Sequence, residues 1–316
     1  MTIIKKEIKN GLPIYTVKKD MNDEKAALLN GKKCTNKMFK TIIDHDCDVY
    51  TEDGKMLLRF RKNVLPQHNI DEFYENVINF AHHKTGCRGA ESAATVKHVN
   101  FNKPIMSNVY GYFDTWTIFQ KHIFKTLKIK PPFSVRVTRF LNEHPDKWQK
   151  MIPLIKNIDQ MYKKLMPREY KIQRKCADET AFKIPDTSFT TMTTNLTTQM
   201  GIHRDSNNLK DSFGNLVVIE KGKYEGGYTG FPQFKVAVDV RTGDYLAMNT
   251  VDHWHGVTPI KLKTPDAERL SVVCYLRQGV WENSKGSTTK DIKHNQETMQ
   301  KILERYNKKI HSKANK

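Results

Sequence analysis

The chain has 316 residues, of which 38% are hydrophobic and 28% are charged, with a formal net charge of +19. That length allows one or two domains, and the hydrophobic content is low but sufficient for a packed core. The excess of positive charge concentrates polyanions near the surface, so nucleic acid is the first partner to consider. A lysine-rich composition of the source organism would produce the same excess.

Cysteine usage and hydropathy indicate the cellular compartment. An odd number of scattered cysteines without a C-x-x-C pair argues against a disulfide framework or zinc knuckle, and favours a reducing compartment: Cys34, Cys47, Cys87, Cys176 and Cys274. The N-terminus lacks the apolar run of a signal peptide, and no stretch approaches the roughly 18 apolar residues of a membrane helix. We expect a soluble, monomeric intracellular protein, in a nucleus or a virus-infected cell.

No element is assigned to the first 65 residues, where periodicity is weak. Apolar residues then recur every three or four positions over 70–80, 116–127 and 148–165, which predicts three amphipathic helices. The second helix is expected to take Asp114 or Thr115 as its N-cap.

Prolines predict where two of these helices end or bend, and alternating apolar residues predict a strand between them. Pro131-Pro132 should stop the second helix, and alternating apolar residues over 133–137 predict a strand. Pro153 must start or kink the third helix, because proline lacks the backbone N–H of the helical ladder.

The pattern changes to short strands after about residue 186. Turn residues separate candidate strands over 187–195, 215–220, 234–240, 245–249 and 270–277. Helices followed by such strands predict an α+β protein, with a β-sandwich or jelly roll buttressed by helices. We divide the chain into an N-terminal extension (1–65), a main domain (66–283) and a basic helical tail (284–316). The tail holds nine Lys/Arg against three acids.

His203-Arg204-Asp205 has the spacing of two metal ligands. Residues two apart on a strand share one face, so both side chains can reach a single ion. A later histidine would complete two imidazoles and one carboxylate, the set that binds non-haem Fe(II) and leaves positions open. His253 and His255 are both candidates. We prefer His255, because Gly256 opens room beside it, and leave His253 as a residue that orients a ligand.

Arg269 and Ser271 form a second pattern, 14 residues after His255. A guanidinium presents a planar fork that matches a carboxylate with two parallel hydrogen bonds. Ser271 lies on the same strand face and can add a hydroxyl donor. An ordinary surface ion pair is the alternative for Arg269 alone, but its position after the histidines favours an anchor for an acidic cosubstrate.

These residues resemble the TET/JBP family of 2-oxoglutarate, Fe(II)-dependent nucleic-acid base dioxygenases over roughly residues 86–280. The resemblance is carried by Arg88-Gly89-Ala90, Thr138-Arg139-Phe140, Phe189-Thr190-Thr191, Asn195, His203-Arg204-Asp205-Ser206-Asn207-Asn208, Gly226-Gly227, Pro232, Gly243-Asp244, His255-Gly256 and Arg269-Leu270-Ser271. The H-R-D-x-x-N and R-x-S runs are its most specific parts. The cysteine-rich zinc-binding insert of animal members is absent.

The resemblance implies a double-stranded β-helix (cupin-like) core and hydroxylation of a pyrimidine methyl group, in thymine or 5-methylcytosine. It assigns iron to His203, Asp205 and His255. It assigns 2-oxoglutarate to Arg269, Ser271 and, less specifically, Asn195, with ascorbate as an assisting reductant. Nucleic acid, DNA rather than RNA, would be the partner.

Two positions bear on the target base. Asn208 matches a family position that faces the base, although a turn residue in a polar loop is the alternative. Arg277 stands where family members that act on 5-methylcytosine place a histidine. A guanidinium supplies only donors, which favours the carbonyl oxygens of thymine, unless Arg277 contacts a phosphate or solvent instead.

Other functions remain open at this point. A 2-oxoglutarate-dependent hydroxylase of protein side chains or a small molecule would share the whole iron site, and a non-catalytic nucleic-acid-binding protein would share the scaffold. Lysines near 121–130 or 163–175 could hold phosphates of a nucleic acid whose target base is flipped out, or be solvated faces.

Overall fold

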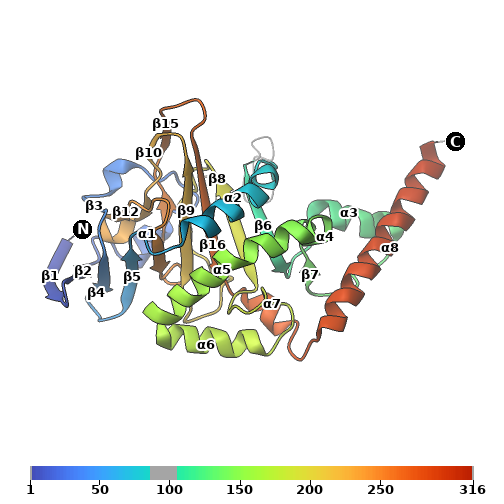
Figure 1. Ribbon diagram of the computed structural model, residues 1–316, viewed down its shortest axis with the longest axis horizontal. Helices are drawn as coiled ribbons and strands as arrows, with labels where there is room; N and C mark the ends of the chain where they lie inside the picture. Colours follow the sequence, from blue (N-terminus) through green and yellow to red (C-terminus); the bar gives the residue numbers. More distant parts are fainter. Residues whose placement is uncertain (1, 86–104, 315–316) are drawn as a thin grey trace.

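A mixed sheet runs through the centre of the molecule (Figure 1). The computed structural model describes residues 2–85 and 105–314. Among these residues, ten strands join in the order β1-β2-β4-β5-β13-β9-β16-β8-β6-β7, and only β2 and β4 pair in parallel. The strands are β1 Thr2–Lys9, β2 Leu12–Lys18, β4 Cys47–Thr51, β5 Met56–Arg61, β6 Ser107–Phe113, β7 Arg136–Val137, β8 Thr191–Leu196, β9 Gly214–Lys221, β13 Tyr245–Met248 and β16 Glu268–Tyr275.

A smaller sheet faces the large one. It has the order β14-β11-β12-β3, and a separate two-stranded ribbon pairs β10 with β15. One buried cluster joins Phe231, Val236 and Val238 of the small sheet to Leu216 and Leu246 of the large sheet, so the two sheets share a core. The remaining strands are β3 Thr41–Ile43, β10 Tyr224–Gly226, β11 Thr229–Phe231, β12 Val236–Val238, β14 Gly256–Val257 and β15 Ile260–Leu262.

Each predicted strand range contains a strand, although several are shorter than expected. The range 187–195 begins its strand only at Thr191, and 234–240 is extended only over Val236–Val238. The range 133–137 was predicted as one strand, but only Arg136–Val137 pairs, with the end of β6.

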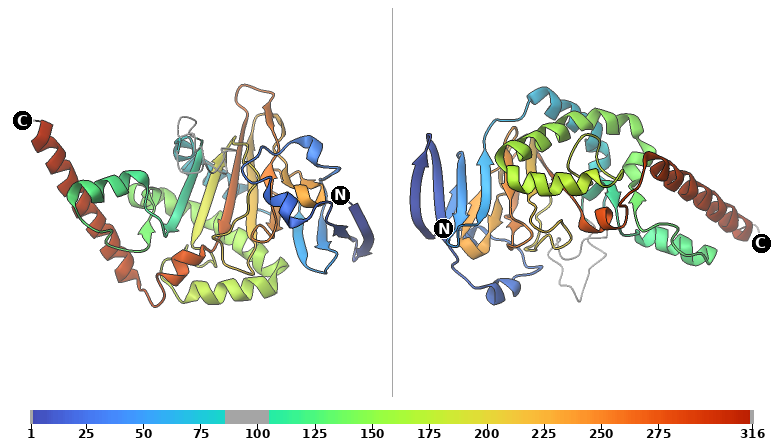
Figure 2. Two further views of the ribbon diagram at one scale, coloured as in Figure 1. Left: turned by 180° about the vertical axis from the view of Figure 1, so that it is seen from behind. Right: turned by 90° about the horizontal axis from the view of Figure 1, so that it is seen from below.

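Helices α2, α5 and α6 cover one face of the large sheet (Figure 2). α2 packs along α5, and α6 packs against α5 in turn. Their apolar stripes are the predicted ones over 70–80 and 148–165. The helices are α1 Asp23–Ala27, α2 Gln67–Ala81, α3 Ile118–Leu127, α4 Arg139–Glu143, α5 Pro145–Leu165, α6 Pro167–Asp178, α7 Gln278–Glu282 and α8 Thr289–Ala314.

Helix ends differ from the sequence-based expectation in two places. The N-cap of α3 is Thr117, and neither Asp114 nor Thr115, because Thr117 and Gln120 form a reciprocal capping box. α3 ends where Lys128 adopts the left-handed conformation, before the Pro131-Pro132 pair. α5 starts at Pro145, where a missing N–H costs no helical hydrogen bond, and continues through Pro153.

The first 65 residues contribute five strands that the sequence did not predict. β5 pairs with β13 and thereby attaches β1, β2 and β4 to the large sheet, while β3 joins the small sheet through β12. The loop after α1 also contacts the centre of the molecule, where Gly31 N–H donates to the Ile202 carbonyl and Ile202 N–H donates to the Lys32 carbonyl. The division at residue 65 stays a prediction.

α8 is the helix predicted for the tail, and it extends beyond the sheets (Figure 2). It packs on α3, where Tyr306 and Ile302 meet Ile123 and Leu127. None of the described helices is both long enough and apolar enough to cross a membrane.

Candidate metal centre and its pocket

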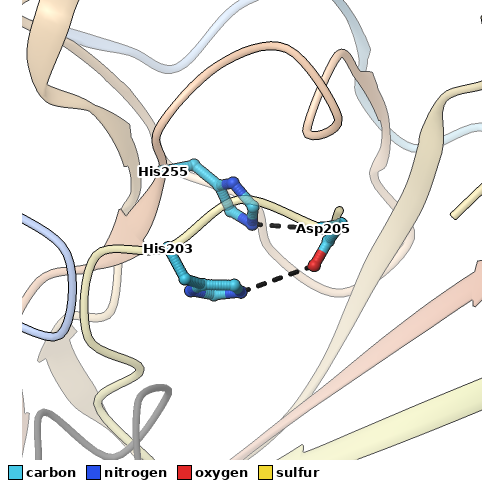
Figure 3. A group of neighbouring side chains, drawn as sticks. All are labelled: His203, Asp205 and His255. Carbon is cyan, nitrogen blue, oxygen red and sulfur yellow. Dashed lines mark ion pairs between the residues drawn. The ribbon is translucent and has the colours of Figure 1, made fainter. Parts of the chain in front are cut away.

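The three predicted ligands meet at one point (Figure 3). His203 and His255 form an antiparallel bridge, in which each backbone N–H donates to the carbonyl of the other at 2.9 Å. The oxygens of Asp205 lie 3.5 Å from His203 Nε2 and 3.8 Å from His255 Nε2. One ligand atom of each residue lies within 4.8 Å of the other two, a spacing that suits one ion. Two imidazoles and a carboxylate are the ligands of mononuclear non-haem iron.

The protonation states of these ligands suit a metal. Burial, together with the nearby His203, lowers the pKa of His255 to about 4. Burial alone would raise the pKa of Asp205, but a hydrogen bond from His203 and the charges of both imidazoles hold it well below its ordinary value. His203 Nδ1 faces the Gly201 carbonyl at 2.8 Å, which leaves Nε2 as the ligand atom. Neutral imidazole and ionised carboxylate are the metal-binding forms.

His253 does not join the cluster. Its ring is buried against Phe234, with ring centroids 5.1 Å apart, and burial lowers its pKa to about 4. Its Nδ1 has no hydrogen-bond partner among the described residues. Its carbonyl lies 3.3 Å from His255 Nδ1, so His253 orients the ligand through its backbone. The geometry therefore favours His255 over His253.

Arg269 is a buried cation that forms no ion pair with a described carboxylate. Its side chain is 1% exposed, and its Nε and Nη2 have no hydrogen-bond partner among the described residues. Burial lowers the pKa of its guanidinium. Gly227, at φ +71°, lies against it, and a Cβ there would stand 2.7 Å from Arg269 Cδ. A buried guanidinium with unsatisfied donors fits the far carboxylate of 2-oxoglutarate.

Asn195 and Ser271 lie opposite each other on β8 and β16. Asn195 Nδ2 donates to Ser271 Oγ at 3.5 Å, and its Oδ1 accepts from Ser107 Oγ at 2.7 Å. Ser107, the first residue of β6, also belongs to this polar group. The sequence analysis did not identify it, since a lone serine at the start of a strand carries no distinguishing pattern.

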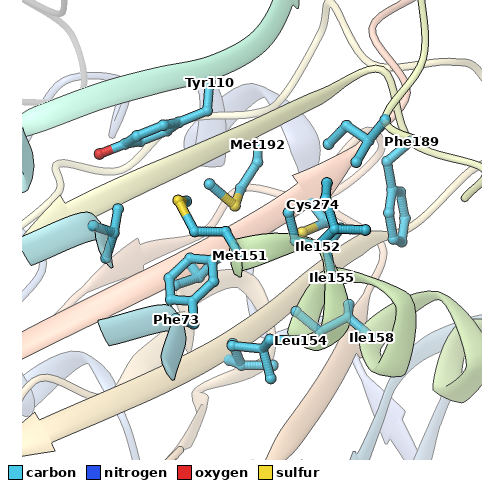
Figure 4. Close-up of a cluster of buried hydrophobic side chains, with 14 of the residues drawn as sticks. Phe73, Tyr110, Met151, Ile152, Leu154, Ile155, Ile158, Phe189, Met192 and Cys274 are labelled. Atoms are coloured by element: carbon cyan, nitrogen blue, oxygen red, sulfur yellow. The ribbon is translucent and has the colours of Figure 1, made fainter. Parts of the chain in front are cut away.

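All the predicted site residues line one cavity of about 780 Å³. It includes the triad, Arg269, Ser271, Asn195, Asn208 and Arg277. The alternation of side chains along the strands shows on which face of the large sheet the cavity lies, because successive residues of a strand point to opposite faces. Leu216 and Val273 line the cavity, whereas their neighbours Val217 and Val272 join the core that α2 and α5 cover, seen in Figure 4. The cavity therefore opens on the face opposite those helices.

An antiparallel backbone bridge brings Asn208 and Arg277 together. Their contact with a target base stays a prediction. The Arg277 side chain is held more firmly than expected. Its Nε donates to Asp114 in a short ion pair, and its guanidinium lies 4.1 Å from the ring centroid of Phe113. Asp114 thus acts as the partner of Arg277, and the sequence could not reveal this because 163 residues separate the two.

The remaining motif residues have varied positions. Thr138 and Arg139 line the cavity, whereas Phe140 is in the helix-side core. Asp244 caps the turn after Arg241 by accepting from its N–H. Arg88-Gly89-Ala90 lies outside the described residues.

Comparisons with known proteins bear on the fold and on the family. Residues 124–278 match the family model described as the oxygenase domain of the 2OGFeDO superfamily, Tet_JBP. A structure of NgTET1 in complex with 5mC DNA matches with a TM-score of 0.52 at 15% identity, covering 88% of this chain and 100% of that chain. This likeness concerns the fold, and it confirms the double-stranded β-helix core. The scaffold is that of a 2-oxoglutarate/Fe(II) oxygenase.

Two curated relatives are named as thymine dioxygenases. The bifunctional helicase and thymine dioxygenase JBP2 of Leishmania major is 30% identical over 202 residues, covering 61% of this chain and 17% of that protein. The thymine dioxygenase JBP1 of Crithidia fasciculata is 26% identical over 210 residues, which cover 64% of this chain and 24% of that protein. The chain thus spans less than a quarter of these relatives. The segment over residues 124–278 is therefore similar to the oxygenase domain of the Tet/JBP family.

Proposed function

We propose that this protein is an Fe(II)- and 2-oxoglutarate-dependent dioxygenase that hydroxylates the methyl group of a pyrimidine base in DNA. The observation that carries the proposal is the triad of His203, Asp205 and His255 sharing one cavity with the unpaired guanidinium of Arg269. Relatives named thymine dioxygenases favour thymine over 5-methylcytosine as the target.

The residues have separate roles in this proposal. His203, Asp205 and His255 would hold the iron, and Arg269 with Ser271 would hold 2-oxoglutarate, whose polar surroundings Asn195 completes. The bound iron and cosubstrate would supply the oxidising chemistry that replaces a methyl hydrogen by a hydroxyl group. The protein's contribution is to bind and orient both partners in a cavity that sheet residues enclose. Ascorbate as an assisting reductant stays a prediction.

The target base must leave the duplex to reach this centre. The triad lies within a cavity whose walls include buried strand residues, and a stacked base cannot enter it. Asn208 lines the cavity and offers an amide that can both donate to and accept from a Watson–Crick edge.

Arg277 is the second candidate contact to the base. It supplies donors only, so it favours the carbonyl oxygens of thymine. Asp114 takes one of those donors and fixes the guanidinium over Phe113, which leaves the others for the base. An intracellular setting, nuclear or in a virus-infected cell, and a monomeric state stay predictions.

The test is to incubate the protein with Fe(II), 2-oxoglutarate and oligonucleotides that contain thymine or 5-methylcytosine. We expect a mass gain of one oxygen on the base, absent with His203→Ala. Cosubstrate turnover without any oxidised base would contradict nucleic acid as substrate and would favour hydroxylation of a protein side chain or small molecule.

A further inference from the structure

Helix α3 connects the cavity to the outer arm of the molecule. Trp116, Thr117, Ile118 and Lys121 at its start line the same cavity as the metal ligands. Its far end packs against α8, the helix that projects beyond the sheets (Figure 2). A nucleic acid whose base occupies the cavity would therefore have α3 beside its backbone.

One face of α3 carries a basic stripe, which we define as Lys121, Lys125 and Lys128. Lys121 and Lys125 are four positions apart, so they lie on one side of the helix, and Ile118 continues that side to the cavity. Lys128 is the C-cap residue that directly follows the helix. All three lysines are exposed, and none forms an ion pair with a described residue. α3 contains no acidic residue. The stripe is therefore a row of uncompensated positive charges.

The opposite side of α3 is fixed to the body of the protein. Ile123 and Leu127 are buried against Tyr306 of α8, and Lys309 of α8 donates to the Thr126 carbonyl at 2.8 Å. Phe124 packs edge-on against Trp116, with ring centroids 5.0 Å apart. α8 thus supports α3 from behind, so the basic stripe has a fixed direction.

We propose that the basic stripe of α3 binds the phosphate backbone of duplex DNA beside the base that enters the cavity. This inference rests on the proposed function, and it names the surface that holds the rest of the substrate. The seven residue steps from Lys121 to the C-cap Lys128 cover about 10 Å at the rise of an α-helix. That length covers about three phosphates of one strand, at about 3.4 Å of axis each.

A second group of exposed basic residues provides the comparison. Lys171 and Lys175 lie four positions apart on α6, as Lys121 and Lys125 do on α3. α6 packs on α5, which covers the face of the large sheet opposite the cavity. DNA held at the cavity cannot reach it, so equal charge changes on the two helices should have unequal effects.

The experiment measures binding of the full chain to a thymine-containing duplex of about 20 base pairs, two helical turns, at several salt concentrations. For Lys121→Gln/Lys125→Gln we expect weaker binding, and a slope of log K against log salt that is about two units shallower. For Lys171→Gln/Lys175→Gln we expect the slope of the unmodified protein. Glutamine keeps helix propensity close to that of lysine, and thermal melting checks both folds.

Equal slopes for the two variants, or a shallower slope for the α6 variant alone, would overturn the proposal. Base oxidation of a thymidine dinucleotide by the unmodified protein is measured in parallel. A dinucleotide is too short to follow α3, so oxidised product with equal slopes would refute the α3 surface and spare the function. No oxidised product on either substrate would refute the function itself.

Discussion

The two halves of the cavity are built in different ways. The cosubstrate half consists of buried residues on neighbouring strands, such as Arg269 and Ser271 on β16 and Asn195 on β8. The metal triad lies beside it, joined by the backbone bridge of His203 with His255, and of the three only His255 is buried. The nucleic-acid half consists of the loop around Asn208, the ion pair of Arg277 with Asp114, and the exposed start of α3. Chemistry that every member of a superfamily shares can be fixed in a sheet, whereas substrate choice lies on loops and helices that vary independently.

The largest effect that would test this comparison is on the metal. Asp205→Asn removes the charged ligand between the two histidines, and we expect iron affinity to fall by more than about 100-fold, beyond the effect of changing a residue behind a ligand. The measurement is iron retained after dialysis. His253→Ala, two residues from His255, is the control and should retain iron; if it loses as much iron as Asp205→Asn, the triad is assigned wrongly.

The cosubstrate anchor should give the next largest effect. Arg269→Lys keeps the charge but loses the planar fork, so we expect the Kd for 2-oxoglutarate to rise by roughly 10- to 100-fold. Calorimetric titration of 2-oxoglutarate into the iron-loaded protein measures it. Arg241→Lys is the matched control, because Arg241 pairs with Glu220 and Asp239 and does not line the cavity. A similar Kd for both variants would contradict the anchor.

A substitution at Gly227 tests whether the cosubstrate half of the cavity tolerates one added methyl group. Gly227→Ala places a Cβ 2.7 Å from Arg269 Cδ, so we expect the guanidinium to shift and the Kd for 2-oxoglutarate to rise by roughly tenfold. Gly54→Ala controls for backbone strain, because Gly54 has φ +78° with nothing within 4 Å of the added Cβ. Unchanged cosubstrate affinity in Gly227→Ala would show that this half is less rigid than its packing indicates.

The smallest effect should be on base choice. Arg277→His removes the donor-only side chain and the ion pair with Asp114, and it introduces a ring nitrogen that can accept. We expect the preference for thymine over 5-methylcytosine, measured as the ratio of kcat/KM values, to fall by up to about tenfold. Cosubstrate affinity should stay unchanged. An unaltered ratio would mean that Arg277 serves Asp114 and the loop, with no role in reading the base.

The sequence predicted the sheet half better than the nucleic-acid half, for physical reasons. The H-x-D spacing and the strand alternation around Arg269 are local patterns, so the meeting of His203, Asp205 and His255 could be anticipated. The pairing of Arg277 with Asp114 depends on contacts between distant segments and left no local signal.

The helices and strands also differ in how well a local sequence pattern predicted them. Long apolar stripes predicted α2, α5 and α8, because a helix must bury one face against the core. The strands before residue 65 lack a clear period of two. β1 is exposed along nearly its whole length, so no buried face imposes alternation on it, whereas β4 is buried on both faces along most of its length. The capping box of Thr117 with Gln120 was present in the sequence and was overlooked in favour of an earlier cap.

The pairing of β5 with β13 has a practical consequence for excising the oxygenase segment. The family match begins at residue 124, but β13 bonds to β5 and β8 bonds to β6, both of which precede it. β12 likewise bonds to β3. A fragment trimmed to the match would therefore leave backbone N–H and C=O groups of three strands unpaired, and such exposed strand edges can pair with other chains. We therefore expect the amino-terminal strands to keep the oxygenase segment from self-association.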